Sequence, residues 1–132
     1  MNCKSLLSIT IPENVIQVKS NAFLGCTSLK SISWNATKIT DFSSIESSPF
    51  HELRSNINSF VFGEAVQHIP AYLCYDMDNL TNIKIGQNTR SIGNEAFANC
   101  DGLSSICLPK NINRIGAYAF LDCLNLTSVT CE

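Results

Sequence analysis

The feature that most constrains this chain is an internal repeat of about 23 residues. Each copy begins with an apolar residue, and these residues stand 23 positions apart except for one interval of 28. The leading residues are Leu6, Leu29, Ile57, Leu80, Leu103 and Leu126. Five full units and a partial sixth therefore fill the chain. Because one such unit cannot bury its own apolar side, the repeat predicts a solenoid of stacked coils.

A short strand is expected near the start of every unit. Apolar residues recur three and five positions after the leading residue, and the residues beside them are mostly small and polar. The apolar pairs are Ile9 and Ile11, Ile32 and Trp34, Phe60 and Phe62, Ile83 and Ile85, Ile106 and Leu108, and Val129 and Cys131. This alternation is typical of a half-buried strand. Consecutive strands should pair in parallel at roughly 4.8 Å.

The second half of each unit predicts a further inward residue and then a short helical turn. The inward residues are Val18, Ile69, Ile92 and Ile115. The turns carry Ala22-Phe23, Leu73-Cys74, Ala96-Phe97 and Ala119-Phe120, and their last apolar positions hold Cys26, Met77, Cys100 and Cys123. We expect the phenylalanines to stack as a column and to contribute most to the core, since truncating a buried Phe costs about 3–5 kcal/mol.

The consensus L-x-x-I-x-I-P-x-x-V-x-x-I-G-x-x-A-F-x-x-C resembles the BspA-type leucine-rich repeat. The match is strong in four units and blurred only between Asn35 and Asn56. The resemblance implies an α/β repeat solenoid with a parallel β-sheet on its concave face and short helical turns on its convex side. It also implies a cell-surface or secreted protein of an anaerobic bacterium or a parasitic protist, with a role in adhesion. The family defines no catalytic residues.

Composition and the ends of the chain bound the remaining possibilities. Residues 1–132 are 45% hydrophobic and form a single expected domain, and the net charge of −2 with 15% charged residues argues against a nucleic-acid partner. No apolar run approaches the length of a membrane span, and Met1 is not followed by a signal peptide. The chain starts and ends within a repeat, so we expect it to be part of a longer array.

The candidate binding surface is the outward side of the predicted strands. Two outward columns result from the alternation. The candidate site residues are Ser8, Ser31, Ser59, Asn82 and Ser105 in the first column, and Thr10, Ser33, Val61, Lys84 and Cys107 in the second. The columns continue to Ser128 and Thr130. This small, polar surface could bind a protein or glycan, or its residues could simply suit an exposed strand. It lacks the Trp, Tyr and Arg anchors that usually dominate affinity, so binding should depend on multivalency.

The second unit is five residues longer than the others, within Ala36 to Asn56. We expect Ile39 and Phe42 to replace the paired apolar positions, Pro49-Phe50 the Ala-Phe pair, and Leu53 the Cys position. The extra residues, Ser43 to Ser48, should bulge from the convex or lateral side. They could form a recognition loop, or a neutral expansion of the kind that surface loops tolerate. Trp34 is interpreted as a core residue rather than a ligand-stacking one.

Seven cysteines follow the repeat rather than a pairing pattern. Cys3, Cys26, Cys100 and Cys123 share one repeat position, which favours a ladder of small buried residues, and Cys74 replaces a phenylalanine. A Cys100–Cys123 disulfide is the alternative. Cys107 should be exposed, which suits a reducing or anaerobic habitat. No metal ion or other cofactor is predicted, because no CxxC or HxxxH pattern occurs.

The histidines and the glycosylation sequons are weak evidence for a functional site. His51 and His68 have no Ser or Cys partner at a suggestive spacing, so a surface location is favoured over a catalytic pair. Sequons begin at Asn35, Asn79 and Asn125, two of them at one repeat position, which suggests by-products of the consensus.

The favoured function is a non-enzymatic, adhesin-like module that binds an extracellular-matrix or cell-surface protein, or a glycan, through its concave face. The alternatives are a structural stalk and an intracellular interaction scaffold. An enzyme is disfavoured, because no nucleophile, base and orienting group recur together.

Overall fold

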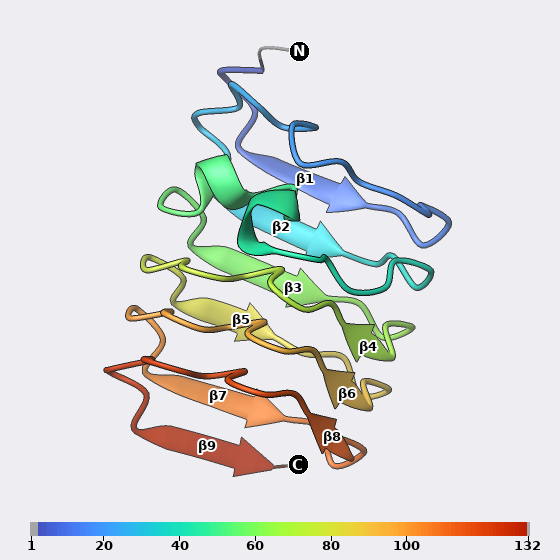
Figure 1. The fold of residues 1–132 in the computed structure, drawn as a ribbon, viewed down its shortest axis with the longest axis vertical. Helices are drawn as coiled ribbons and strands as arrows, with labels where there is room; N and C mark the ends of the chain where they lie inside the picture. Colours follow the sequence, from blue (N-terminus) through green and yellow to red (C-terminus); the bar gives the residue numbers. More distant parts are fainter. Residues whose placement is uncertain (1–2, 132) are drawn as a thin grey trace.

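The computed structural model describes residues 3–131, which form a solenoid of stacked parallel-strand coils. The first and the last of the described coils lie at opposite ends of the stack (Figure 1). The predicted repeat solenoid and its units of about 23 residues are therefore confirmed.

One side of the solenoid carries the predicted strands. They are β1 (Ser8–Ile11), β2 (Ser31–Trp34), β3 (Ser59–Phe62), β5 (Asn82–Lys84), β7 (Ser105–Leu108) and β9 (Ser128–Cys131). They pair in parallel as β1-β2-β3-β5 and as β7-β9, and the hydrogen-bonded ladder is interrupted between β5 and β7. Ser31 still pairs with Ser59 across the 28-residue interval. The five extra residues are therefore absorbed outside the strands.

A second, smaller sheet covers an adjacent side of the later coils only. Its strands are β4 (His68–Ile69), β6 (Ser91–Ile92) and β8 (Arg114–Ile115), which pair in parallel in that order. Figure 1 shows them below the blue and cyan coils, which have no such strand. The predicted inward residues Ile69 and Ile92 are fully covered here.

The predicted helical turns are not formed as helices. The described residues contain only two short 3-10 helices, η1 (Ile45–Ser47) and η2 (His51–Leu53), both in the irregular second unit. In the third and fourth units these segments are turns in which alternate N–H groups donate to the next coil, and the N–H groups between them donate within the turn. The N–H groups of Tyr72, Cys74 and Asp76 donate to the carbonyls of Asn94, Ala96 and Ala98 at 3.1, 2.9 and 2.8 Å.

Left-handed backbone makes this coil-to-coil bonding geometrically feasible. Tyr72 and Asp76 have φ values of 62° and 60°, and Glu95 and Asn99 in the next coil have 53° and 58°. This conformation costs roughly 1–2 kcal/mol for a residue with a side chain. The hydrogen bonds to the neighbouring coil offset that cost, because an unpaired buried N–H group is also expensive.

An aromatic chain runs through the core, as the Phe column predicted. Phe23 stacks on Phe50 with ring centroids 5.2 Å apart, and Phe97 stacks on Phe120 at 5.5 Å. Trp34 is fully buried, which confirms its core assignment. The Trp34 ring packs against Phe50 inside the core, where the two rings meet edge-on with their centroids 6.3 Å apart.

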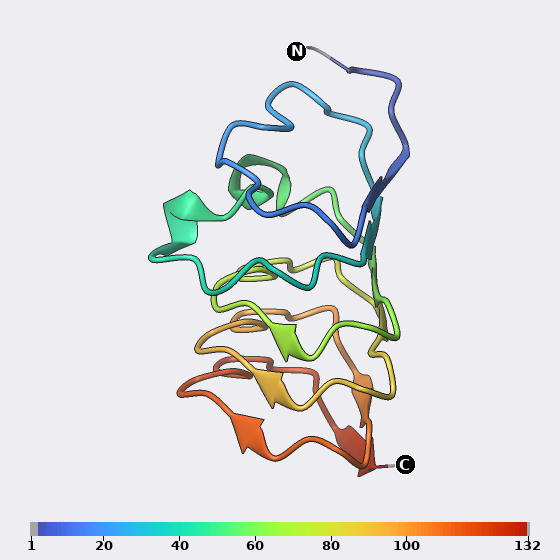
Figure 2. The same cartoon turned by 90° about the vertical axis from the view of Figure 1, so that its right-hand side faces the viewer.

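The irregular second unit joins this core as predicted. The stacking of Phe50 on Phe23 shows that Pro49-Phe50 replaces the Ala-Phe pair, and Leu53 is buried at the Cys position. The extra residues form η1, which projects on the side opposite the main strands (Figure 2). The hydroxyl of Ser48 donates to the carbonyl of Leu73 at 3.3 Å and so connects this segment to the third coil.

Asparagine side chains connect the coils at both ends of the main strands. Asn79 and Asn125 donate to the carbonyls of Ser55 and Asp101 at 2.7 and 2.8 Å. Asn88 donates to the carbonyl of Glu64 at 3.0 Å. The asparagines of the two equivalent sequons therefore have a structural use, which accounts for their recurrence.

Candidate functional site

The strand face is the outward side of β1, β2, β3, β5, β7 and β9. The strand register places the predicted residues in two columns. Ser8, Ser31, Ser59 and Asn82 align in the first, Thr10, Ser33, Val61 and Lys84 in the second, and Ser105 and Cys107 align with Ser128 and Thr130. All are exposed or half-buried, whereas Ile32, Phe60 and Ile106 between them are buried. The geometry matches the predicted columns, and their role in binding stays a prediction.

The strand face is polar, and Lys84 alone among the ten predicted residues carries a charge. The Asn82 amide donates to the Ser59 hydroxyl at 2.9 Å, which fixes two neighbouring groups in orientation. Shallow depressions lie at both edges. One, of about 450 Å³, is lined by Lys30, Asn58 and Thr81, and the other, of about 370 Å³, is lined by Glu13 and Glu64 among others. One depression therefore carries a lysine and the other carries two glutamates.

His68 is at the centre of a hydrogen-bonded trio that the sequence did not predict. Its Nε2 lies 2.6 Å from Asp41 Oδ1, and its Nδ1 lies 2.7 Å from Ser91 Oγ. The Ala71 N–H also donates to Asp41 Oδ1, at 2.9 Å. Partial burial raises the pKa of Asp41, but the hydrogen bonds from His68 and Ala71 outweigh it, so the pKa is lowered overall.

The surroundings of Ser91 favour a structural role for this trio. Nucleophilic catalysis needs N–H donors aimed at a developing oxyanion. The N–H groups of Ser91 and Gly93 instead donate to the carbonyls of Gln67 and Ile69 in the preceding coil. The trio connects three successive coils, and the prediction that His68 is a surface residue agrees with its half-buried side chain.

The cysteines are free thiols, and three of them are buried: Cys26, Cys74 and Cys100. The Cys100 thiol donates to the carbonyl of Cys74 at 3.1 Å, and that of Cys123 to the carbonyl of Phe97 at 3.0 Å. The hydrogen bond between Cys100 and Cys123 lowers the pKa of Cys123 to about 7 and, together with burial, raises that of Cys100. Cys107 is exposed on the strand face, as predicted.

The described residues show neither a metal-binding cluster nor a membrane-spanning helix. Residues 3–131 contain no group of three or more His, Cys, Asp or Glu side chains that could hold a metal ion. Within the same part of the chain, no helix is long and apolar enough to cross a membrane.

Comparisons with known proteins identify a repeat family. The BspA type leucine rich repeat region matches residues 1–127 in six copies. A comparison with curated proteins finds no match.

Solved bacterial structures share the fold. A leucine-rich repeat protein from Eubacterium ventriosum is 28% identical, with a TM-score of 0.69 over 89% of this chain and 31% of its own. One from Bacteroides ovatus is 26% identical, with a TM-score of 0.66 over 95% and 37%. A leucine rich cell surface protein from Faecalibacterium prausnitzii is 24% identical, with a TM-score of 0.62 over 98% and 40%. This chain therefore spans less than half the length of these relatives.

Proposed function

This chain belongs to the BspA-type leucine-rich repeat family, and we propose that it is a non-enzymatic binding module that recognises a host or cell-surface protein through its strand face. The family shares a protein-interaction fold. The adhesive role, the partner and the surface location are the parts that we propose.

The alignment of outward side chains on the strand face is the observation that carries this proposal. Residues at one repeat position pair across successive strands, so that Ser31, Ser59 and Asn82 present hydroxyl and amide groups in one line. A partner that lies along the solenoid axis would meet the same chemistry once per coil. Extended surfaces of this kind are what solenoids offer to partners.

The charges at the edges of the strand face support a protein partner of complementary polarity. Lys30 lies at one edge, and Glu13 and Glu64 lie at the other. Charges at the rim of an interface mainly orient the partner and accelerate association. The centre of the face offers hydrogen bonds without aromatic anchors, so each coil contributes little affinity and the whole array provides the rest.

Display on a cell surface is supported by the relatives. The structure from Faecalibacterium prausnitzii is described as a leucine rich cell surface protein. An adhesive function suits a partly repetitive, polar face, because weak sites become effective when many copies act together.

Surface plasmon resonance on a panel of extracellular-matrix proteins tests the proposal. The informative variant is the triple substitution Ser59→Glu, Lys84→Glu and Ser105→Glu, which adds bulk and negative charge across the strand face. The control is Gln67→Glu, which adds one negative charge beside the second sheet. The proposal predicts that the triple variant loses binding and that the control retains it. Unchanged binding by the triple variant would point to a stalk or to another surface.

A further inference from the structure

A lateral slot opens between the first two coils, where the later coils are closed. It is formed by Ile16–Ser20 of the first coil and Lys38–Ser43 of the second. In the later coils the corresponding segments are hydrogen-bonded to each other. The N–H groups of Arg90 and Gly93 donate to the carbonyls of Gln67 and Ile69, each at 2.8 Å.

The backbone of the slot has no such pairing. Within the described part of the chain, residues 16–18 and 38–43 make no backbone-to-backbone hydrogen bond. A hollow of about 460 Å³ separates the two segments, which is within the range of ligand sites in proteins. Unpaired backbone groups of this kind are a template for an added strand.

Beside the slot, the second coil is attached to the third through a side chain rather than through its backbone, since Asp41 accepts hydrogen bonds from His68 and from the Ala71 N–H. Asp41 also lines the slot, but its carboxylate is already bonded to the third coil. The backbone from Lys38 to Ser43 remains available on the slot side.

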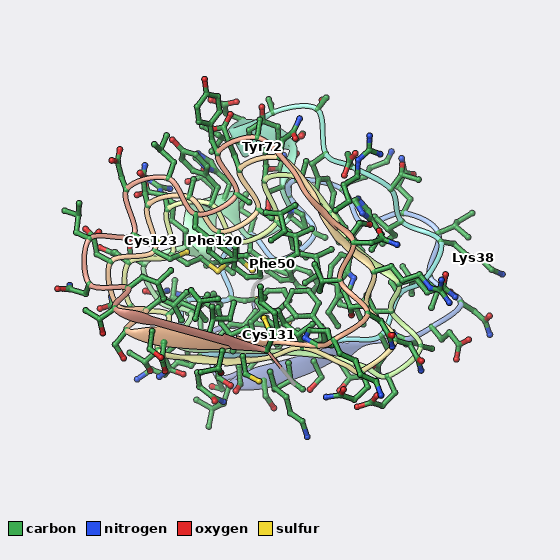
Figure 3. The ribbon with its side chains drawn as sticks, turned by 90° about the horizontal axis from the view of Figure 1, so that it is seen from below. Lys38, Phe50, Tyr72, Phe120, Cys123 and Cys131 are labelled. Carbon is green, nitrogen blue, oxygen red and sulfur yellow. The ribbon has the colours of Figure 1, made fainter. Side chains whose placement is uncertain are left out.

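The walls of the slot combine apolar groups with two lysines and with the carboxylate of Asp41, which is bonded to His68. Ile16 is 72% exposed and Phe42 is half-buried. Lys19 and Lys38 both line the slot, and neither has an acidic partner among the described residues, where the ion pairs are Arg54–Asp76 and His68–Asp41. Figure 3 shows Lys38 pointing outward, away from Cys123.

We propose that the lateral slot binds an extended, acidic segment of a partner protein, which adds a short strand between the first two coils. The unpaired backbone groups on both sides would bond to the segment's main chain. Lys19 and Lys38 would pair with its carboxylates, and Ile16 and Phe42 would cover its apolar side chains. Strand addition of this kind draws affinity from main-chain hydrogen bonds and specificity from alternate side chains. The slot is separate from the strand face, so the two proposals stand independently.

Fluorescence anisotropy with designed peptides tests this inference. The probe is a labelled heptapeptide of alternating Glu and Val, Glu-Val-Glu-Val-Glu-Val-Glu. One control has the same sequence with N-methylated valines, which keeps the charge but removes alternate N–H donors. A second control replaces every Glu with Lys. We expect the probe to bind at least about tenfold more tightly than either control, a difference of one decade in Kd.

Variants of the protein locate the site. Lys19→Ala with Lys38→Ala should weaken binding of the probe, and Gln17→Trp, which fills the slot, should abolish it. The matched control is Lys30→Ala with Lys84→Ala, which removes two lysines from the strand-face region and should leave binding unchanged. Thermal unfolding of each variant checks that it is folded.

Four outcomes would overturn the inference. Absence of probe binding would contradict it directly. Equal binding of the N-methylated peptide, or competition by a sulfated disaccharide with the same lysine dependence, would show that the slot recognises charge rather than a strand. An equal loss of binding in the Lys30 and Lys84 control would place the peptide on the strand face.

Discussion

Phe62 meets Phe97 edge-on, with ring centroids 6.2 Å apart, beside the position where Cys74 replaces the repeat phenylalanine. Phe62 also stacks on Phe60 at 4.9 Å. The third unit thus has two phenylalanines in its strand where the fourth unit has two isoleucines, and a cysteine in its turn where both neighbouring units have phenylalanine. The aromatic chain therefore stays continuous although one repeat position has lost its ring.

This compensation predicts that Cys74→Phe destabilises the protein by about 1–3 kcal/mol, because it overpacks a filled site. Adding Phe62→Leu should restore part of that loss by making room for the new ring. A double-mutant cycle measured by urea unfolding gives the interaction energy between the two positions. Strictly additive effects would contradict the compensation.

The stacked phenylalanines should dominate stability. Phe97 is fully buried between Phe62 and Phe120. Phe97→Ala should therefore cost about 3–5 kcal/mol, whereas Ser105→Ala on the exposed strand face should change the free energy of unfolding by less than about 0.5 kcal/mol. Thermal and urea unfolding of both variants compare these costs, and similar losses would be inconsistent with the assigned register.

The register was readable from the sequence because the apolar residues recur at fixed intervals, and in the central units the residues at these positions are buried. Even the displaced Phe50 could be placed, because Phe50 and Leu53 keep the three-residue spacing that separates the Phe and the Cys in the regular units. The helical turns were predicted wrongly because the sequence of one unit does not show that the next coil supplies carbonyl acceptors. Alternate N–H groups of the turn bond to the next coil instead of continuing a helix.

The trio of Asp41, His68 and Ser91 was only partly accessible from the sequence. His68 and Ser91 occupy the same repeat position in successive units, so an alignment of polar columns would have paired them. Asp41 lies in the irregular unit, where the five extra residues interrupt the 23-residue interval on which such an alignment depends. Local insertions therefore hide contacts that the rest of a repeat protein reveals.

The trio makes a pH-dependent contribution to stability. The pKa of Asp41 is lowered from its ordinary value of 3.8, so its stabilising contribution is present at neutral pH and is lost as the pH falls through the lowered pKa. Asp41→Asn should thus be less stable than the parent at pH 7, and the difference should shrink below about pH 4. Urea unfolding across this pH range measures the effect, and a constant difference at every pH would contradict it.

Cys123 should be the cysteine whose reactivity changes nearest to neutral pH. Its hydrogen bond with Cys100 lowers its pKa to about 7, and Cys100→Ala should move the pKa back toward 9.0 by removing that interaction. The rate of alkylation by iodoacetamide, resolved by mass spectrometry for each cysteine, gives the midpoint because the thiolate is the reactive form. The same midpoint in the parent and the variant would exclude the hydrogen bond as the cause.

The most direct test of the proposed function uses Cys107, which is exposed on the strand face, and Cys123, which lies in a turn away from it, as two reporters in one molecule. The measurement is the rate of maleimide labelling at each cysteine, alone and in complex with the matrix protein that binds. Recognition through the strand face predicts that the complex slows labelling of Cys107 and leaves the rate at Cys123 unchanged. Protection of Cys123 with no change at Cys107 would contradict it.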